Sequence, residues 1–356
     1  MPPSRRTATL LSLLFAWPAL AGQPERIRLQ SPEAVLEVTP ALGGRVLHFA
    51  APGAPNLLKV GAEVDARPYP EVSAHADDIG HLGHDVWLGP QSEWWTDQSV
   101  NTERRDARAP WPPDPFLSFA VTRVLEQNAD KLVLDGIDSP VSGVRLSKSF
   151  ELDSKDPATV VLHVVARNIH DRPISRDLWF NTRASAAMRV YVPVAGAGDV
   201  RIESHERMAP PAWRIEGGLF SLLSPPLPED LDTRRGKVFL QPSTGWMAGF
   251  FAGQALVIRF DHHPVERIHA EHGQVELYVE HGDDPAAGLL ELEVHAPYRT
   301  LAAGETMVAS ERWSVLRYDG DDDPAAHAAF LCTVAAPRLR APELCPAAGD
   351  ADAVAP

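Results

Sequence analysis

Residues 83–95, GHDVWLGPQSEWW, bring together side chains well suited to hold a sugar. A sugar ring has apolar C–H faces that indole rings can cover, and a rim of hydroxyls that amide, carboxylate and imidazole groups can bind. The candidate binding residues are Trp87, Gln91 and Trp95, with His84 beside them. The alternative is that the tryptophans plug the open end of a β-sandwich. If they bind sugar, Trp87→Ala and Trp95→Ala will weaken saccharide binding more than they lower the melting temperature.

The stretch LLELEVHAP, residues 289–297, carries a second group of candidates. Alternation along a strand places Glu291, Glu293 and His295 on one face and apolar residues on the other. A carboxylate that faces a tryptophan-lined groove can act as a general base on a hydroxyl. We expect this role for Glu293 and assign Glu291 to an ordinary solvated face.

Other familiar kinds of site are not indicated. The chain has no phosphate-binding loop, no glycine fingerprint for dinucleotides and no nucleophile elbow. His81 and His84 lie three residues apart, and DHHP begins at Asp261, but neither pattern has the spacing of a zinc site. In a strand His262 and His263 would face opposite sides. We therefore expect no bound metal and no cofactor.

Alternation of apolar and polar residues with a period of two dominates the chain and predicts an all-β fold. Short connections between neighbouring stretches favour antiparallel pairing, so we expect a large antiparallel β-sandwich with long loops. The predicted strands lie within residues 34–40, 44–50, 118–127, 131–137, 143–152, 159–169, 255–261, 275–282, 289–297 and 311–318.

Helical patterning is scarce. One short helix is predicted over residues 323–336, with Asp323 as its N-cap ahead of Pro324. Two long segments, 61–116 and 203–235, lack strong periodicity. The first carries Trp87, Trp94, Trp95 and Trp111, so we expect an ordered insertion lying over one face of a sheet.

The N-terminal residues have the order typical of a secretory signal peptide. Arg5 and Arg6 precede an apolar run and an Ala-Leu-Ala cleavage site, so residues 1–21 are assigned to the signal and residues 22–340 to the domain. This predicts a periplasmic or secreted protein. In such an oxidising compartment the two cysteines, Cys332 and Cys345, are expected to pair and to tether the tail, residues 341–356, whose end is expected to be disordered.

The charge of the chain limits its partners. Loss of Arg5 and Arg6 would take the formal net charge from −15 to −17. A protein this acidic repels nucleic acid and anionic lipid. We therefore expect neither nucleic acid binding nor membrane insertion. The oligomeric state stays open.

Several motifs resemble those of the galactose mutarotase-like proteins, the aldose 1-epimerase superfamily, and of a secreted bacterial branch in particular. They are LEVTPALGGRVLHF with NLL soon after, GHDVWLGPQ, WPPDP, and a closing LELEVHAPYRTLAAGETMVASERWSV. The resemblance spans most of the mature chain. It implies a supersandwich of antiparallel strands with a saccharide site on the concave face.

The resemblance also implies catalytic positions. Mutarotases take a proton from the anomeric hydroxyl with a Glu, which matches Glu293, and protonate the ring oxygen with a His from a segment like NHxYFN. Here RDLWFN stands in that place, so Asp177 falls on the acid position. An Asp serves as the acid only if burial raises its pKa. Otherwise the role passes to another group, such as His84 or His262.

Three further residues are assigned to the substrate site, and the resemblance supplies the position of one of them, Asp261. Arg183 is close enough along the chain to pair with Asp177, and Asp261 is matched to a supporting acidic position, with His262 next to it. The alternative for Arg183 is an ion pair with Asp177 that merely ties neighbouring strands.

The expected function is therefore that of a carbohydrate-active periplasmic protein with a saccharide ligand, possessing aldose 1-epimerase-like acid–base chemistry if it is an enzyme. The alternatives are a non-catalytic carbohydrate-binding module and a structural envelope protein on the same fold. Acid–base catalysis requires a second titratable group within about one sugar ring of Glu293.

Overall fold

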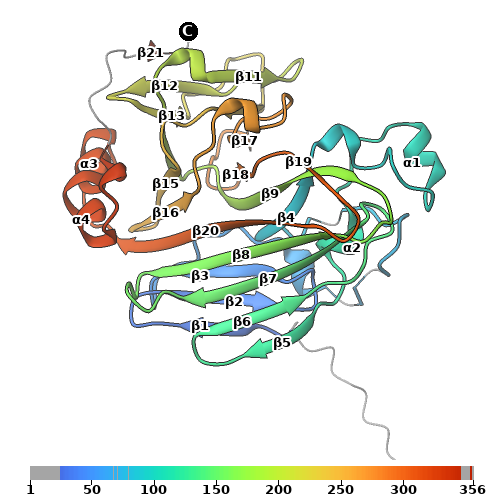
Figure 1. Ribbon diagram of the computed structural model, residues 1–356. Helices are drawn as coiled ribbons and strands as arrows, with labels where there is room; N and C mark the ends of the chain where they lie inside the picture. The colour runs from blue at the N-terminus through green and yellow to red at the C-terminus, as the bar shows by residue number, and fades with distance from the viewer. Residues whose placement is uncertain (1–24, 67, 70, 79, 346–352, 355–356) are drawn as a thin grey trace, which may run out of the picture.

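The protein folds into two large antiparallel β-sheets packed face to face (Figure 1). The computed structural model describes residues 25–66, 68–69, 71–78, 80–345 and 353–354. The predicted signal peptide, residues 1–21, lies outside these ranges, as do residues 346–352 and 355–356 of the predicted tail. Within the part of the tail expected to be disordered, Ala353–Val354 instead form a short strand. The first sheet has ten strands, with β19 (Arg299–Leu301) paired to β9 beside the main path. The other nine follow in spatial order: β1 (Ile27–Gln30), β2 (Val35–Thr39), β3 (Arg45–Ala50), β4 (His84–Gly89), β9 (Ile174–Ser185), β18 (Leu289–His295), β17 (Val275–His281), β14 (Arg234–Leu240) and β11 (Val200–Ser204).

The second sheet has eleven strands. Its spatial order is β21 (Ala353–Val354), β12 (Ala212–Glu216), β13 (Leu219–Leu223), β10 (Arg189–Pro193), β15 (Trp246–Phe251), β16 (Gln254–Phe260), β20 (Thr306–Arg317), β8 (Thr159–Asn168), β7 (Val144–Leu152), β6 (Lys131–Asp135) and β5 (Arg123–Gln127). Each of the ten predicted stretches contains or overlaps a strand of one sheet or the other. The predicted antiparallel β-sandwich is thus confirmed.

The main core lies between the sheets and follows from the alternation along each strand. On β18, for example, Leu290, Leu292 and Val294 point into the core, as do Leu178 and Phe180 of β9. The residues between them therefore face outward from the sandwich. This second face of the ten-stranded sheet carries the site described below.

A helical segment of sixteen residues covers part of the outer face of the second sheet. It consists of α3 (Pro324–Phe330), a π-helical turn (Leu331–Ala335) and α4 (Ala336–Leu339), somewhat longer than the predicted 323–336. The Asp323 side chain caps it by accepting a hydrogen bond from the N–H of Ala326 at 2.9 Å. Leu331 and Leu339 pack in a cluster with Trp246 of the sheet, and Cys332 forms a disulfide with Cys345.

The remaining helices are short. They are α1 (Thr102–Asp106), α2 (Pro115–Ser118) and the 3-10 turns Ala62–Asp65, Gln91–Glu93, Ala197–Asp199, Val265–Arg267 and Pro342–Leu344. Among the described residues, no helix combines the length and the apolar composition needed to cross a membrane.

The two segments without clear periodicity contain strands that the sequence analysis missed. Residues 61–116 include β4, a central strand of the first sheet, and residues 203–235 include the hairpin of β12 and β13. The first segment is thus only partly an insertion over a sheet. Its residues after Gly89 form turns and the helices α1 and α2.

Glu311 of β20 makes stability depend on pH. This side chain is buried, and its carboxylate accepts a hydrogen bond from Nε1 of Trp313 at 2.8 Å. Burial raises the pKa of Glu311 to about 8. Because the folded state holds the proton more tightly than the unfolded chain, this contribution is fully present below the unfolded pKa of 4.5 and is lost as pH rises to about 8. We expect Glu311→Gln to reduce the fall in melting temperature between pH 5 and pH 9, measured against wild type. Equal slopes in the two proteins would contradict the prediction.

Candidate functional site

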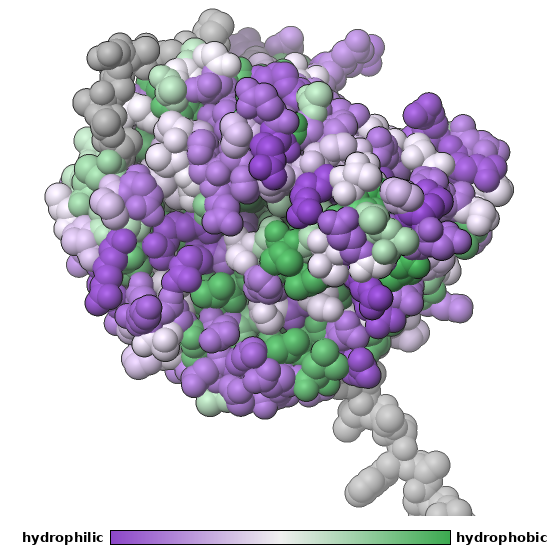
Figure 2. Space-filling view, viewed as in Figure 1, coloured by the Kyte–Doolittle hydropathy of each residue, from purple (hydrophilic) through white to green (hydrophobic). Residues whose placement is uncertain are grey.

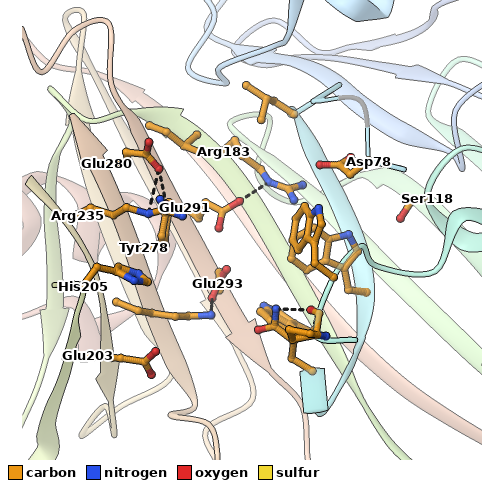
Figure 3. Close-up of a pocket in the computed structure, with 18 of the residues that line it drawn as sticks. Asp78, Ser118, Arg183, Glu203, His205, Arg235, Tyr278, Glu280, Glu291 and Glu293 are labelled. Atoms are coloured by element: carbon orange, nitrogen blue, oxygen red, sulfur yellow. Dashed lines mark hydrogen bonds and ion pairs between the residues drawn. The ribbon is translucent and has the colours of Figure 1, made fainter. Parts of the chain in front are cut away.

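A cavity of about 740 Å³ opens on the outward face of the ten-stranded sheet. In Figure 3, side chains from β11, β14, β17 and β18 lie on one side of it, and Asp78 from a loop and Ser118 from the end of α2 lie on the other. It is lined by Arg45, Asp78, Leu82, Trp87, Gln91, Pro110, Trp111, Ser118, Trp179, Arg183, Glu203, His205, Arg235, Lys237, Tyr278, Glu280, Leu289, Glu291 and Glu293.

Strand register brings the chemistry-bearing groups together. Trp179 of β9 lies opposite Trp87 of β4 on one side and His295 of β18 on the other. One step along, Glu293 lies opposite Asn181 of β9 and Glu276 of β17. Since directly opposite residues share a face, these groups form one polar and aromatic surface across the middle of the sheet.

Glu293 lies in the cavity wall and is held by two neighbours. Asn181 Nδ2 donates to Glu293 Oε1 at 3.0 Å, and Lys237 Nζ lies 2.7 Å from its Oε2. The same ammonium lies 2.5 Å from Oε2 of Glu276, so one cation bridges two buried carboxylates. Lys237 also lies over the ring of Trp179, 4.5 Å from its centroid.

The two bridged carboxylates differ in protonation. Burial raises the pKa of Glu293 well above its usual range. The charge of Lys237 lowers this pKa, but the charges of Glu291 and Glu276 raise it further. Burial also favours neutral Glu276, but Lys237 and His295 outweigh it and hold the pKa of Glu276 well below its usual range. Glu276 is therefore the ionised partner, and Glu293 is the carboxyl that holds its proton more tightly.

Asp177 lies behind the cavity wall, in contact with His295. Asp177 Oδ1 accepts a hydrogen bond from the N–H of Gly89 at 2.8 Å, and its Oδ2 lies 3.5 Å from Nδ1 of His295. Burial would lower the pKa of His295, but Glu276 and Asp177 raise it to about 9. His295 lies within 4.8 Å of Glu293, so a second titratable group does stand within a sugar ring of the candidate base. Neither Asp177 nor His295 lines the cavity, however.

Arg183 does not pair with Asp177, contrary to the interpretation offered from the sequence. Its Nε donates to Glu291 Oε1 at 2.9 Å, and its guanidinium lies 4.5 Å from the ring centroid of Trp87. Glu291 therefore lines the cavity and binds Arg183, and its assignment to an ordinary solvated face was wrong. The two residues have this arrangement because they are directly opposite on β9 and β18.

His84 is separated from the cavity by its own strand. Its side chain packs on the core side, where Nδ1 lies 2.9 Å from Thr182 Oγ1 and the ring meets the edge of Trp313 at 4.7 Å. Burial holds the pKa of His84 well below its usual range, so the ring is neutral. The structure thus places it where it cannot reach a ligand in this cavity.

Trp95 also belongs to the interior, contrary to its predicted binding role. It is 0% exposed, and its Nε1 donates to the carbonyl of Pro112 at 2.7 Å. The tryptophan that reaches the cavity from the neighbouring loop is Trp111, which is 47% exposed. Its ring centroid lies 5.9 Å from that of Trp87.

Asp261 and His262 are exposed residues that follow β16 and do not line the cavity. The His262 ring nitrogen Nε2 lies 2.9 Å from the carbonyl of Pro242, and the Asp261 carbonyl accepts a hydrogen bond from Gln274 Nε2 at 2.7 Å. Of the predicted site residues, Trp87, Gln91, Arg183 and Glu293 line the cavity together.

Several lining residues were not predicted. Trp179 and Lys237 stand on strands that the sequence analysis missed, β9 and β14. Tyr278 and Glu280, by contrast, belong to a predicted strand, VELYVEHG, in which they alternate with apolar residues. That alternation was a usable signal, since it matches the pattern that identified Glu293.

Among the described residues, three groups of side chains resemble metal ligands by type. One of them, His269, Glu271 and His272, is partly exposed, and the other two are more deeply buried. Asp177, His272 and His295 offer ligand atoms within 4.8 Å of one another. The rings of His272 and His295 are stacked, however, with centroids 3.9 Å and planes 21° apart, so their in-plane lone pairs do not converge on one ion. In the second group, Glu276, Glu293 and His295, the Lys237 ammonium already contacts both carboxylates. As placed, neither of these two buried groups fits a metal ion.

Comparison with solved structures shows a shared fold at low sequence identity. The Slr1438 protein from Synechocystis sp. PCC 6803 has a TM-score of 0.52 and 13% identity, over 85% of this chain and 100% of that one. A GalM/aldose epimerase homologue from C. elegans has a TM-score of 0.50 and 12% identity, over 83% of this chain and 99% of that one. The galactose mutarotase-like fold is thereby confirmed.

Comparison at the level of sequence identifies the family. No curated protein matches this chain. The model of a family described as "Domain of unknown function (DUF4380)" matches residues 24–316. These include every residue that lines the cavity, the whole first sheet, and the second sheet except β21 and the last residue of β20. The chain therefore belongs to the DUF4380 family.

Proposed function

We propose that this protein binds a saccharide in the cavity and that Glu293 exchanges a proton with a sugar hydroxyl, as in an aldose 1-epimerase-like reaction at the anomeric centre. The observation that carries the proposal is the position of Glu293, a buried carboxyl with a raised pKa, in the wall of a cavity that tryptophans also line. We include export to the periplasm in the proposal, on the pattern of residues 1–21.

The side chains in the cavity wall suit the base-catalysed step of mutarotation, in which the anomeric hydroxyl loses its proton. A carboxylate whose pKa is raised is a stronger base when ionised, so Glu293 is suited to take the proton from the anomeric hydroxyl. Lys237 lies 2.7 Å from it and also lines the cavity, which places a positive charge beside the opening ring. The position of the ring-oxygen acid in mutarotases corresponds here to Asp177, which lies behind the wall.

A neutral sugar is the expected ligand. The cavity's cations are engaged by carboxylates: Arg183 by Glu291 at 2.9 Å, and Arg235 by Glu280 at 3.4 Å. An acidic sugar would have to compete with these carboxylates, whereas hydroxyl groups can bind both members of each pair.

A non-catalytic saccharide-binding protein is the second candidate, favoured by the burial of Asp177 and His295 away from the cavity. A structural envelope protein is favoured less. Such a protein would present one flat apolar patch, but the face shown in Figure 2 is largely polar, with apolar groups in separate patches.

A thermal-shift screen of the mature protein against neutral and acidic sugars tests the proposal. A ligand that binds only the folded state raises the melting temperature by mass action. We expect a rise with one class of neutral sugar and none with the corresponding uronic acid. A folded protein that responds to no sugar in the panel would refute saccharide binding.

Trp111→Ala is expected to weaken binding of that sugar about tenfold while the melting temperature of the free protein stays within about 1 °C of wild type, because the ring is half exposed. Trp95→Ala is the matched comparison, since its ring is buried and hydrogen-bonded. It should lower the melting temperature strongly. Loss of stability in Trp111→Ala with affinity unchanged would assign Trp111 to the core and not to the ligand.

A further inference from the structure

A second, smaller hollow of about 160 Å³ lies at the outer face of the eleven-stranded sheet, near the end of the C-terminal helix. It is bounded by the turn between β7 and β8, by β16 and β20, and by the residues that end α4. Five of its lining residues are cationic: Lys155, Arg259, Arg312, Arg338 and Arg340. The two acidic lining residues are Asp153 and Asp156, so the formal charge of the lining is +3 (five minus two) in a chain of net charge −15.

Arg259 lies beside another cation and forms no ion pair of its own among the described residues. Arg259 of β16 lies directly opposite Arg312 of β20, and like charges at directly opposite positions destabilise a sheet. Arg312 is compensated by an ion pair with Asp153. Arg259 has no such ion pair: its Nη1 donates to the carbonyl of Leu339 at 3.4 Å, and its buried Nε has no partner among the described residues. Burial lowers the pKa of Arg259, and the charges of Glu343 and Asp156 offset only part of that effect.

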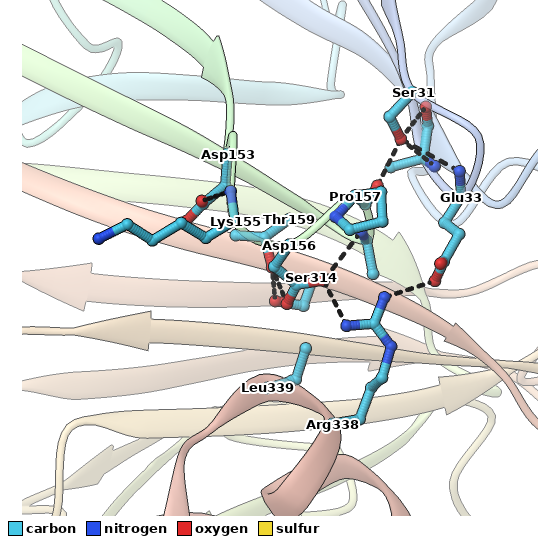
Figure 4. A network of polar contacts seen from close by, with 12 residues as sticks. Ser31, Glu33, Asp153, Lys155, Asp156, Pro157, Thr159, Ser314, Arg338 and Leu339 are labelled. Atoms are coloured by element: carbon cyan, nitrogen blue, oxygen red, sulfur yellow. Dashed lines mark hydrogen bonds and ion pairs between the residues drawn. The ribbon is translucent and has the colours of Figure 1, made fainter.

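Of the three remaining cations of the hollow, one is held in ion pairs and two are not. Figure 4 shows Arg338 between Asp156 and Glu33, at 2.8 Å and 2.9 Å. For Lys155 and Arg340 the described part of the chain offers no ion pair. The negative end of the helix dipole accounts for basic residues near its C-terminus, such as Arg338 and Arg340. Arg259 reaches the same end of the helix from the sheet, through the hydrogen bond of its Nη1 to the Leu339 carbonyl.

We propose that this hollow binds a phosphate group, held chiefly by Arg259, Arg340 and Lys155. Guanidinium groups bind phosphate oxygens through paired N–H donors, and an ammonium adds a point charge. A water molecule takes about 30 Å³, so the hollow accommodates one such group with its hydration but not a nucleotide. The group arrives either as free inorganic phosphate or as the phosphomonoester of a small molecule. Because the hollow shares no residue with the saccharide cavity, this inference does not depend on the proposed function.

The test compares the melting temperature in phosphate with that in chloride at equal ionic strength and pH, for wild type and Arg259→Gln. At a phosphate concentration about tenfold above the dissociation constant, wild type is expected to gain about 2 °C more than the variant. In chloride, Arg259→Gln should be at least as stable as wild type, since it removes the repulsion with Arg312. Arg123→Gln, on β5 at the far edge of the same sheet, is the control and should keep the full gain.

The source of the phosphate group is resolved by a second arm with glucose 6-phosphate. Equal gains from the two compounds indicate that free phosphate suffices, and a larger gain from the ester indicates a carried group. An equal phosphate gain in wild type, Arg259→Gln and Arg123→Gln would show a general salt effect and refute the proposal. If Arg259→Gln is unstable in chloride, Arg340→Gln repeats the comparison, and full retention of the phosphate effect in that variant overturns the proposal.

Discussion

Asp85→Asn is expected to lower the free energy of unfolding by about 3–5 kcal/mol, which is typical of removing one partner from a buried ion pair. Asp85 is fully buried, and its carboxylate lies 3.0 Å from Arg45 Nη2 and 3.1 Å from Lys148 Nζ. Arg45 belongs to β3 of the first sheet and Lys148 to β7 of the second, so this cluster joins the two layers of the sandwich. The substitution would leave two buried cations without a counter-charge.

The pKa of Asp85 gives this cluster a defined pH dependence. Burial would raise that pKa, but Arg45 and Lys148 lower it to about 2. Because the pKa is depressed below the unfolded value of 3.8, the stabilisation is present above about pH 4 and is lost as pH falls towards 2. Urea unfolding at pH 7 measures the effect of the substitution. Asp97→Asn is the control, since Asp97 and its partner Arg172 are both 46% exposed and should contribute less than about 1 kcal/mol. Similar small losses in the two variants would contradict the account of the cluster.

The strands that could be predicted are those with one apolar and one polar face. Residues 143–152 and 159–169 alternate clearly, and they form β7 and β8. The central strands β4 and β9 could not be found in this way, because both of their faces are buried. Their outward face carries tryptophan and buried polar groups such as Asp177 and Asn181 in place of a solvated polar surface, which removes the period of two.

In the candidate site, too, the residues that could be predicted are those on strands that alternate between apolar and polar residues. Glu293 stands out because its strand alternates, and the register then brings it opposite Glu276. The choice between Trp95 and Trp111 depends on the path of the loop that follows Gly89, which no periodic pattern encodes. Lys237 could not be assigned to Glu293 either, since that contact depends on the order of β14, β17 and β18 within the sheet.

Glu293→Gln is expected to slow anomer exchange of the bound sugar at least a hundredfold, the usual contribution of a general acid or base, while affinity changes little. Glutamine keeps the size of the side chain and can still accept the hydrogen bond from Asn181, which is now 3.0 Å from Oε1. It cannot exchange a proton. Exchange spectroscopy by NMR, with the sugar identified in the thermal-shift screen, measures the rate in wild type and variant.

The control for this experiment is Glu311→Gln, which removes another buried carboxyl of raised pKa on the other sheet, outside the cavity. It should leave exchange unchanged. Equal exchange rates in wild type and Glu293→Gln would exclude Glu293 as the base. If wild type binds the sugar without accelerating exchange, the non-catalytic candidate is correct, and the raised pKa of Glu293 then reflects only the burial of two carboxylates around the single ammonium of Lys237.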